Sequence, residues 1–98
     1  MKRAQELEVA LRVVDGIHVV SVRGEVDLDT RDRFDRELEP LREGDGPAVL
    51  DLEAVPFMDS SGLHVVVRLW QALVAEGRAL AVACGPHGVR KLLSLIHI

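Results

Sequence analysis

The chain has 98 residues, of which 48% are hydrophobic and only 3% aromatic. This length allows one domain with a single aliphatic core and excludes a second domain or a large enclosed substrate cavity. The formal net charge of −4 argues against a nucleic-acid partner. With one cysteine, no apolar leader and no run of membrane-spanning length, the sequence favours a cytoplasmic protein that does not insert into a membrane.

The first part of the chain is expected to form an antiparallel β-hairpin. Apolar residues alternate with polar or small ones from residue 7 to residue 13, the pattern of a strand with one covered face. The Asp15-Gly16 dipeptide that follows is a strong hairpin signal, so residues 17–23 should return antiparallel. We expect Val20 and Val22 to face the core, and His18 to face solvent or a neighbouring loop. The covered face of the first strand should carry Leu7, Val9, Leu11 and Val13.

A helix with a charged outer face is expected after this hairpin. Asp29 or Thr30 is the predicted cap, because short polar side chains accept hydrogen bonds from the first amides of a helix. Pro40 removes a hydrogen bond inside the helical pattern, so the helix should kink or end near Glu39. Its buried face should carry Phe34, Leu38 and Leu41.

Two short apolar runs, residues 48–52 and 79–84, are expected to be parallel strands joined by a right-handed crossover through a helix. Pro56 ends the first of them. From Pro86 onward, apolar residues at helical spacing predict a last helix. The order of these elements predicts an α/β fold.

The crossover helix should begin just after Asp59, with Asp59 or Ser60 as its N-cap. Gly62 adds no Cβ to the first turn, which should leave the two serine hydroxyls accessible. The residues expected to face the sheet are Leu63, Val66, Val67, Trp70, Leu73 and Val74. A neighbouring row, made of Val65, Leu69 and Ala72, would either form a docking side for a partner or be covered by another helix.

The stretch from Phe57 to Leu63, Phe-Met-Asp-Ser-Ser-Gly-Leu, resembles the signature of the STAS domain family, especially of the bacterial anti-sigma factor antagonists. A second family-like segment, Gly-Glu-Val-Asp, lies at residues 24–27. The resemblance implies a single STAS domain over residues 1–98. Its fold would be a mixed β-sheet, with an N-terminal antiparallel hairpin followed by parallel strands, and with helices packed mainly on one face. About residues 94–98 are expected to mark a truncation or to be non-native sequence.

The same resemblance implies that the protein antagonises an anti-sigma factor. It would bind a cytoplasmic, ATP-dependent anti-sigma factor serine kinase to release a sigma factor, and phosphorylation at Ser60 would switch it off. A serine phosphatase is a further expected partner. Asp27 would either lie near the serine, helping to hold a metal ion or the phosphate-transfer site, or bond the backbone of its own loop. The expected partner-binding residues are Asp27, Asp59, Ser60, Ser61, Gly62, His64, Val65, Arg68 and Leu69.

Two other functions are compatible with parts of the sequence. A stand-alone STAS protein can also be an accessory subunit that binds the ATPase of a lipid-transport ABC transporter, which the apolar side of the crossover helix would suit. An enzyme is disfavoured, because Ser60 and His64 lie within one helical turn and no Gly-x-Ser-x-Gly elbow is present. No metal-ligand spacing and no glycine-rich phosphate loop occur, so neither a metal site nor a cofactor is expected. Physical reasoning alone leaves Ser60 and Ser61 open as the phosphate acceptor.

Overall fold

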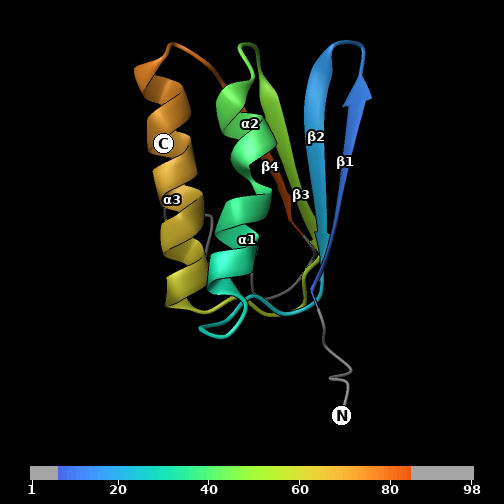
Figure 1. Cartoon of the computed structure of the whole chain (residues 1–98), viewed down its shortest axis with the longest axis vertical. Coiled ribbons are helices and arrows are strands. Elements are labelled where there is room, and N and C mark those ends of the chain that lie inside the picture. Colours follow the sequence, from blue (N-terminus) through green and yellow to red (C-terminus); the bar gives the residue numbers. More distant parts are fainter. Residues whose placement is uncertain (1–6, 85–98) are drawn as a thin grey trace.

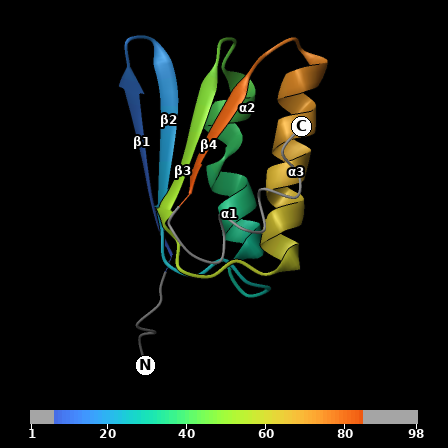
Figure 2. The same cartoon turned by 180° about the vertical axis from the view of Figure 1, so that it is seen from behind.

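The computed structural model describes residues 7–84, in which a four-stranded sheet lies beside a layer of helices. The strand order is β1-β2-β3-β4, with β1 and β2 antiparallel and the remaining neighbours parallel. Figures 1 and 2 show the three helices on one face of this sheet, with the other face bare of described helices. The predicted mixed sheet with helices mainly on one face is therefore confirmed.

The hairpin joins β1 (Glu8–Val14) to β2 (Ile17–Arg23) through a two-residue turn. Asp15 and Gly16 both have positive φ, 52° and 79°, as the tight turn requires. Val20 and Val22 are buried as expected, and His18 lies against the loop at Gly44. The prediction of a covered first strand is wrong at one end. Leu11 and Val13 are 50% and 58% exposed, because the helix layer does not extend over this end of the edge strand.

The parallel strands β3 (Ala48–Ala54) and β4 (Leu80–Cys84) form the centre and the second edge of the sheet. Both predicted strands are present, and Pro56 lies just beyond the first. The inward side chains of β3, Ala48, Leu50 and Leu52, are essentially inaccessible. The core is aliphatic apart from Phe34 and Met58.

The predicted first helix is two short helices, α1 (Arg31–Glu37) and α2 (Glu39–Glu43). Pro40 occupies the first turn of α2, where its missing N–H costs nothing, so the expected break near Glu39 is confirmed. Thr30 holds the N-cap position of α1, but its side chain does not cap the helix. Phe34, Leu38 and Leu41 are fully buried as expected.

The long helix α3 (Ser60–Ala75) turns a face to the core that only partly matches the expected one, since Val66 and Leu73 are buried as expected and Leu63 packs against the core. Its buried residues are Gly62, Val65, Val66, Leu69 and Leu73. Val65 and Leu69 were expected either on a docking side or under another helix, and the second alternative holds for both, because α1 and α2 pack against α3; Ala72 of the same row is exposed. Val74, expected to face the sheet, is 47% exposed. The predicted helix after Pro86 and the prediction about residues 94–98 lie outside the described residues.

Candidate functional site

The two segments singled out in the sequence lie side by side at one end of the sheet. Val26 forms a parallel bridge with Met58, and both side chains are buried. The Val26 amide donates to the Phe57 carbonyl at 3.0 Å, and the Asp59 amide donates to the Val26 carbonyl at 3.1 Å. These bonds tie the loop after β2 to the loop that leads into α3, so the start of α3 has a defined position against both loops.

Asp59, and not Ser60, is the N-cap of α3. Its Oδ1 accepts from the backbone amides of Ser61 and Gly62, at 3.0 and 3.2 Å, and from the Ser61 hydroxyl at 2.6 Å. The hydrogen bond from the Ser61 hydroxyl lowers the pKa of Asp59 most, backbone amides lower it further, and burial opposes them. The carboxylate is therefore charged at neutral pH beside the two serines.

The two serines differ in their surroundings. Ser61 is half-buried, and its hydroxyl is bonded to Asp59. Ser60 is the first residue of the helix and is exposed, and its hydroxyl has no hydrogen-bond partner among residues 7–84. Of the two hydroxyls, that of Ser60 is thus the one that an incoming reagent could reach without breaking a capping bond.

Gly62 does not meet the expectation that it contacts a partner, because it is buried. A Cβ atom at this position would lie 2.5 Å from Cγ1 of Val26 and 2.8 Å from Cγ of Met58. The glycine is needed for the close approach of α3 to the Val26–Met58 bridge, a packing role that differs from keeping hydroxyls accessible.

Asp27 lies in the loop bridged to the serine segment, and its carboxylate bonds its own loop. Its Oδ1 accepts from the amides of Asp29 and Thr30, at 3.0 and 3.1 Å. Within the described chain, no three side chains of the metal-ligating types converge on one point. Of the two interpretations of Asp27, the structure thus supports loop stabilisation.

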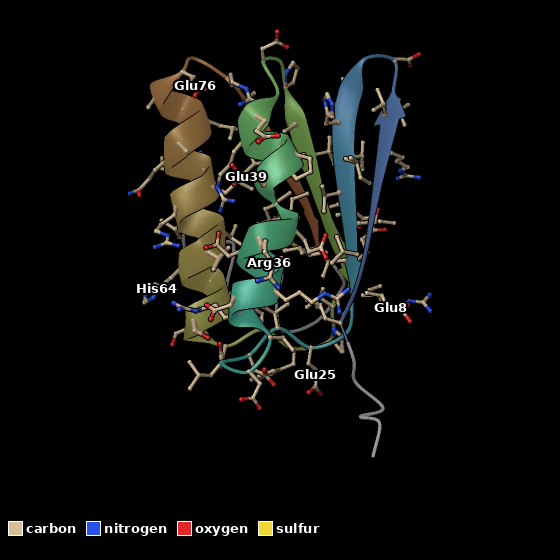
Figure 3. All side chains as sticks on the ribbon, viewed as in Figure 1. Glu8, Glu25, Arg36, Glu39, His64 and Glu76 are labelled. Atoms are coloured by element: carbon tan, nitrogen blue, oxygen red, sulfur yellow. The ribbon has the colours of Figure 1, made fainter. Side chains whose placement is uncertain are left out.

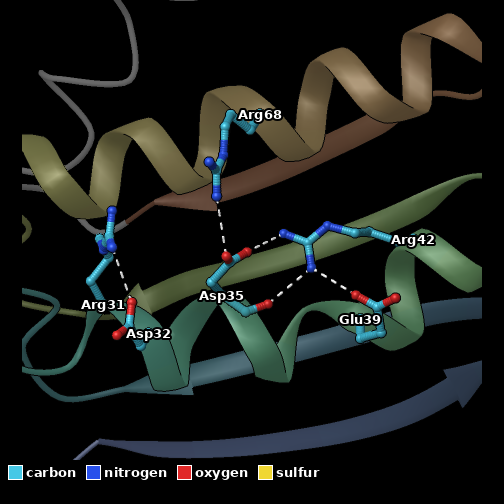
Figure 4. Close-up of polar contacts among 6 residues, drawn as sticks. All are labelled: Arg31, Asp32, Asp35, Glu39, Arg42 and Arg68. Atoms are coloured by element: carbon cyan, nitrogen blue, oxygen red, sulfur yellow. Dashed lines mark hydrogen bonds and ion pairs between the residues drawn. The ribbon is translucent and has the colours of Figure 1, made fainter.

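His64 and Arg68 continue the exposed face of α3 from Ser60 at intervals of four residues, so the three share one side of the helix. Figure 3 shows His64 pointing outward from the lower part of α3. Arg68, 62% exposed, pairs with Asp35 of α1 at 3.2 Å, and Arg42 contacts the same carboxylate from α2 (Figure 4). The charged network therefore links α3 to the two shorter helices beside the exposed row.

Two exposed apolar residues near Ser60 escaped the sequence analysis. Leu28 is 74% exposed in the loop after β2, and Phe57 is 49% exposed three residues before Ser60. The signal was present, since each is a large apolar residue within a polar or proline-containing loop. We refer to Leu28, Phe57, Ser60, His64 and Arg68 together as the Ser60 surface.

In the part of the chain that the structure describes, every helix is too short or too polar to cross a membrane. No curated protein matches the sequence.

Several solved structures are similar to this one. An anti-sigma factor antagonist from Mycobacterium paratuberculosis matches with a TM-score of 0.83 and 24% identity, over 98% of this chain and 82% of the other. A putative anti-sigma factor antagonist from Thermotoga maritima has a TM-score of 0.74 and 19% identity, over 90% and 77% of the two chains. The anti-sigma factor antagonist SpoIIAA in its unphosphorylated form has a TM-score of 0.69 and 23% identity, over 91% and 80%. These likenesses establish a shared fold. A family model for the STAS domain matches residues 8–98, and the chain therefore belongs to the STAS domain family.

Proposed function

We propose that this protein is an anti-sigma factor antagonist that acts in the cytoplasm. It binds an anti-sigma factor serine kinase through the Ser60 surface and thereby releases a sigma factor. Membership of the STAS family supports this role, as do similar structures that are themselves anti-sigma factor antagonists. The observation that carries the proposal is the exposed Ser60 hydroxyl at the start of α3, next to a serine whose own hydroxyl is engaged by the capping aspartate.

In this proposal, phosphorylation of Ser60 switches binding off. The kinase transfers the γ-phosphoryl group of ATP to Ser60 Oγ: the bond from the γ-phosphorus to the β–γ bridging oxygen breaks, ADP leaves, and the hydroxyl proton passes to a base on the kinase. The phosphate adds up to about −2 charge beside Asp59. The Ser61 and Gly62 amides, which would otherwise attract it, already bond Asp59. The new charge is therefore poorly compensated and would be costly to bury in a complex.

The Ser60 surface also suits a partner that dissociates when Ser60 is phosphorylated. Leu28, in the loop bridged to the serine segment, and Phe57, three residues before Ser60, offer exposed apolar area, while His64 and Arg68 offer donors along α3. A phosphate on Ser60 would disturb apolar contacts that a partner makes nearby. A serine phosphatase would restore the binding form. One of the similar structures is described as an unphosphorylated form, which is consistent with a switch of this kind.

The alternative of an accessory subunit on a lipid transporter depended on a free apolar row along α3. Val65 and Leu69 of that row lie in the core, at 1% and 0% exposure. Only Ala72 and the half-buried Trp70 are left to offer apolar area on that side of α3, so the structure favours the Ser60 surface over this alternative.

The acceptor can be tested by incubating the purified protein with anti-sigma factor kinases of the same organism, ATP and Mg²⁺. Wild type and Ser61→Ala should both be phosphorylated on Ser60, and Ser60→Ala should not be. Mass spectrometry of the products identifies the acceptor. Phosphate on Ser61, or the absence of any kinase that modifies the wild type, would contradict the proposed switch.

The docking surface can be tested by calorimetry with the kinase that modifies the protein. Phe57→Ser should weaken binding of the unphosphorylated form by about tenfold or more, because it removes a large apolar contact. Val74→Ser is the matched control, since Val74 is similarly exposed, 47% against 49%, but lies near the other end of α3. Equal losses in the two variants would place the interface elsewhere.

A further inference from the structure

The outer edge of the sheet at β1 lacks the usual protection of an edge strand. Three of the six large hydrophobic residues exposed in residues 7–84 lie on this one strand, Leu11, Val13 and Val14. The strand is seven residues long and pairs with β2 in a continuous register. Natural edge strands are commonly shortened, bulged, or blocked by proline or by charged side chains; β1 is neither short nor bulged, has no proline, and carries only two charged residues, Glu8 and Arg12. Figures 1 and 2 show its outer side without a described neighbour.

The hairpin determines which backbone groups of β1 point outward. Val14 and Ile17 flank the two-residue turn, and such a closing pair exchanges both of its hydrogen bonds. Antiparallel pairs then alternate along the strand, so every second residue back from Val14 bonds to β2. The N–H and C=O groups of the residues between them, Val9, Leu11 and Val13, are directed away from β2. The stretch ends at Leu7, whose carbonyl already accepts from the Arg33 guanidinium.

The only charged residues of β1 are Glu8 and Arg12, which lie on the same face of the strand because they are four residues apart. Neither forms an ion pair with another described residue. Figure 3 shows Glu8 on the outer side of the sheet at the start of β1. A second strand lying antiparallel along this edge could therefore form ion pairs with both the Glu8 carboxylate and the Arg12 guanidinium.

We propose that β1 is a self-association edge, on which β1 of a second copy pairs antiparallel about a two-fold axis at Ala10. In this register Glu8 lies opposite Arg12 of the second copy, and Arg12 lies opposite its Glu8. Val9 lies opposite Leu11 of the second copy, and both belong to the set with outward backbone groups. Two hydrogen-bonded pairs and two opposite-charge pairs then form at once, and the two sheets become one.

Other symmetric registers match the charges less well. A two-fold axis at Leu11 places Glu8 opposite Val14 and Arg12 opposite Ala10, so both charges face apolar residues. An axis at Arg12 places the two arginines face to face, which is unfavourable. An axis at Val9 would pair residues beyond the free stretch, since the Leu7 carbonyl is already engaged.

The expected dimer is weak. Pairing of a few residues along one edge buries less than about 1,200 Å², the range of transient interfaces. Association should therefore appear at protein concentrations between roughly 10 μM and 1 mM, which sedimentation equilibrium can cover.

The decisive variants exchange the two charges. Glu8→Arg and Arg12→Glu should each weaken the dimer about tenfold or more, because each places like charges opposite one another in two symmetric positions. The double variant Glu8→Arg/Arg12→Glu should recover wild-type association. Asp32→Arg makes the same change in net charge as Glu8→Arg at an exposed site on α1, and should associate like wild type. Thermal melts of all variants check that each is folded.

Amide hydrogen exchange gives an independent measurement. The Val9 and Leu11 amides should gain protection as protein concentration rises, whereas the Ala10 and Arg12 amides, bonded to β2, should be protected at every concentration. A wild type that stays monomeric at about 1 mM would overturn the proposal. A dimer kept by both single variants, or lost in them and not recovered in the folded double variant, would overturn the charge-paired register and with it the proposal.

Discussion

Replacing Gly62 with alanine should destabilise the domain by an amount that follows from the packing around it. The new Cβ atom would lie 2.5 Å from Cγ1 of Val26 and 2.8 Å from Cγ of Met58. These neighbours are 0% and 2% exposed and are joined by the bridge between the two loops, so neither can move without shifting that bridge. Because a Cβ at 2.5 Å from a buried neighbour forces that neighbour to shift, the cost of overpacking lies in the upper part of its usual range, about 2–3 kcal/mol, and the better helix propensity of alanine returns about 1 kcal/mol. We expect a net loss of about 1–2 kcal/mol in the free energy of unfolding.

Urea unfolding followed by the fluorescence of Trp70, the only tryptophan, measures this loss. In a thermal melt it corresponds to a fall of roughly 4–8 °C for each kcal/mol in a domain of this size. Gly46→Ala is the control, because a Cβ there meets nothing within 4 Å and its φ is not positive. This variant should be as stable as wild type or slightly more so. A Gly62→Ala protein as stable as wild type, beside a control that behaves as expected, would refute the packing argument.

Three further predictions concern α3. Leu69→Asp should abolish cooperative thermal unfolding, because it places an unpaired charge in the core. His64→Asp, on the exposed face of α3, should still unfold cooperatively. Thermal melts followed by circular dichroism compare the two variants. Folding lowers the pKa of Asp59 below its ordinary value of 3.8. The charged carboxylate therefore stabilises the fold fully above pH 3.8, and this stabilisation is lost as the pH falls through the lower pKa of the folded state. Urea titrations from pH 6 to pH 2 should show that the free energy of unfolding falls less in Asp59→Asn than in wild type. The free energies of unfolding of Ser60→Ala and Ser60→Asp should lie within about 1 kcal/mol of wild type, since Ser60 is not the cap. Calorimetry should show Ser60→Asp binding the anti-sigma factor more weakly than Ser60→Ala; equal affinities would mean that charge at Ser60 is not the switch.

The order and type of the elements could be predicted from local signals. Asp15-Gly16 between alternating runs predicted the hairpin, and two apolar runs with a helical pattern between them predicted parallel strands. Pro40 predicted the break between α1 and α2. These signals work because turn geometry, missing amide donors and side-chain alternation are properties of a few neighbouring residues. The start of α3 was placed to within one residue, with Asp59 and Ser60 both acceptable as caps until the structure separated them.

The face that α3 turns to the core could not be predicted, because the helix is apolar over more than one stripe. Val65 and Leu69 are as suitable for a core as Val67 and Val74, and only the position of α1 and α2 beside α3 decides which pair is buried. The exposure of Leu11 and Val13 has a similar origin. Alternation showed that they share one side of a strand, but not that the helix layer leaves the hairpin end of that strand uncovered.

The sequence by itself determined the family and the elements, because motifs, turn signals and periodicity depend on residues close together in the chain. The roles of Ser60 and its neighbours in binding stay predictions. Only the tertiary structure decided that Val26 is bridged to Met58, that Gly62 is buried against both, and that Leu28 and Phe57 are exposed in the loops joined there. These features arise where two loops separated by about thirty residues pack together. Distances between such loops depend on the whole packed core, and no local pattern carries that information.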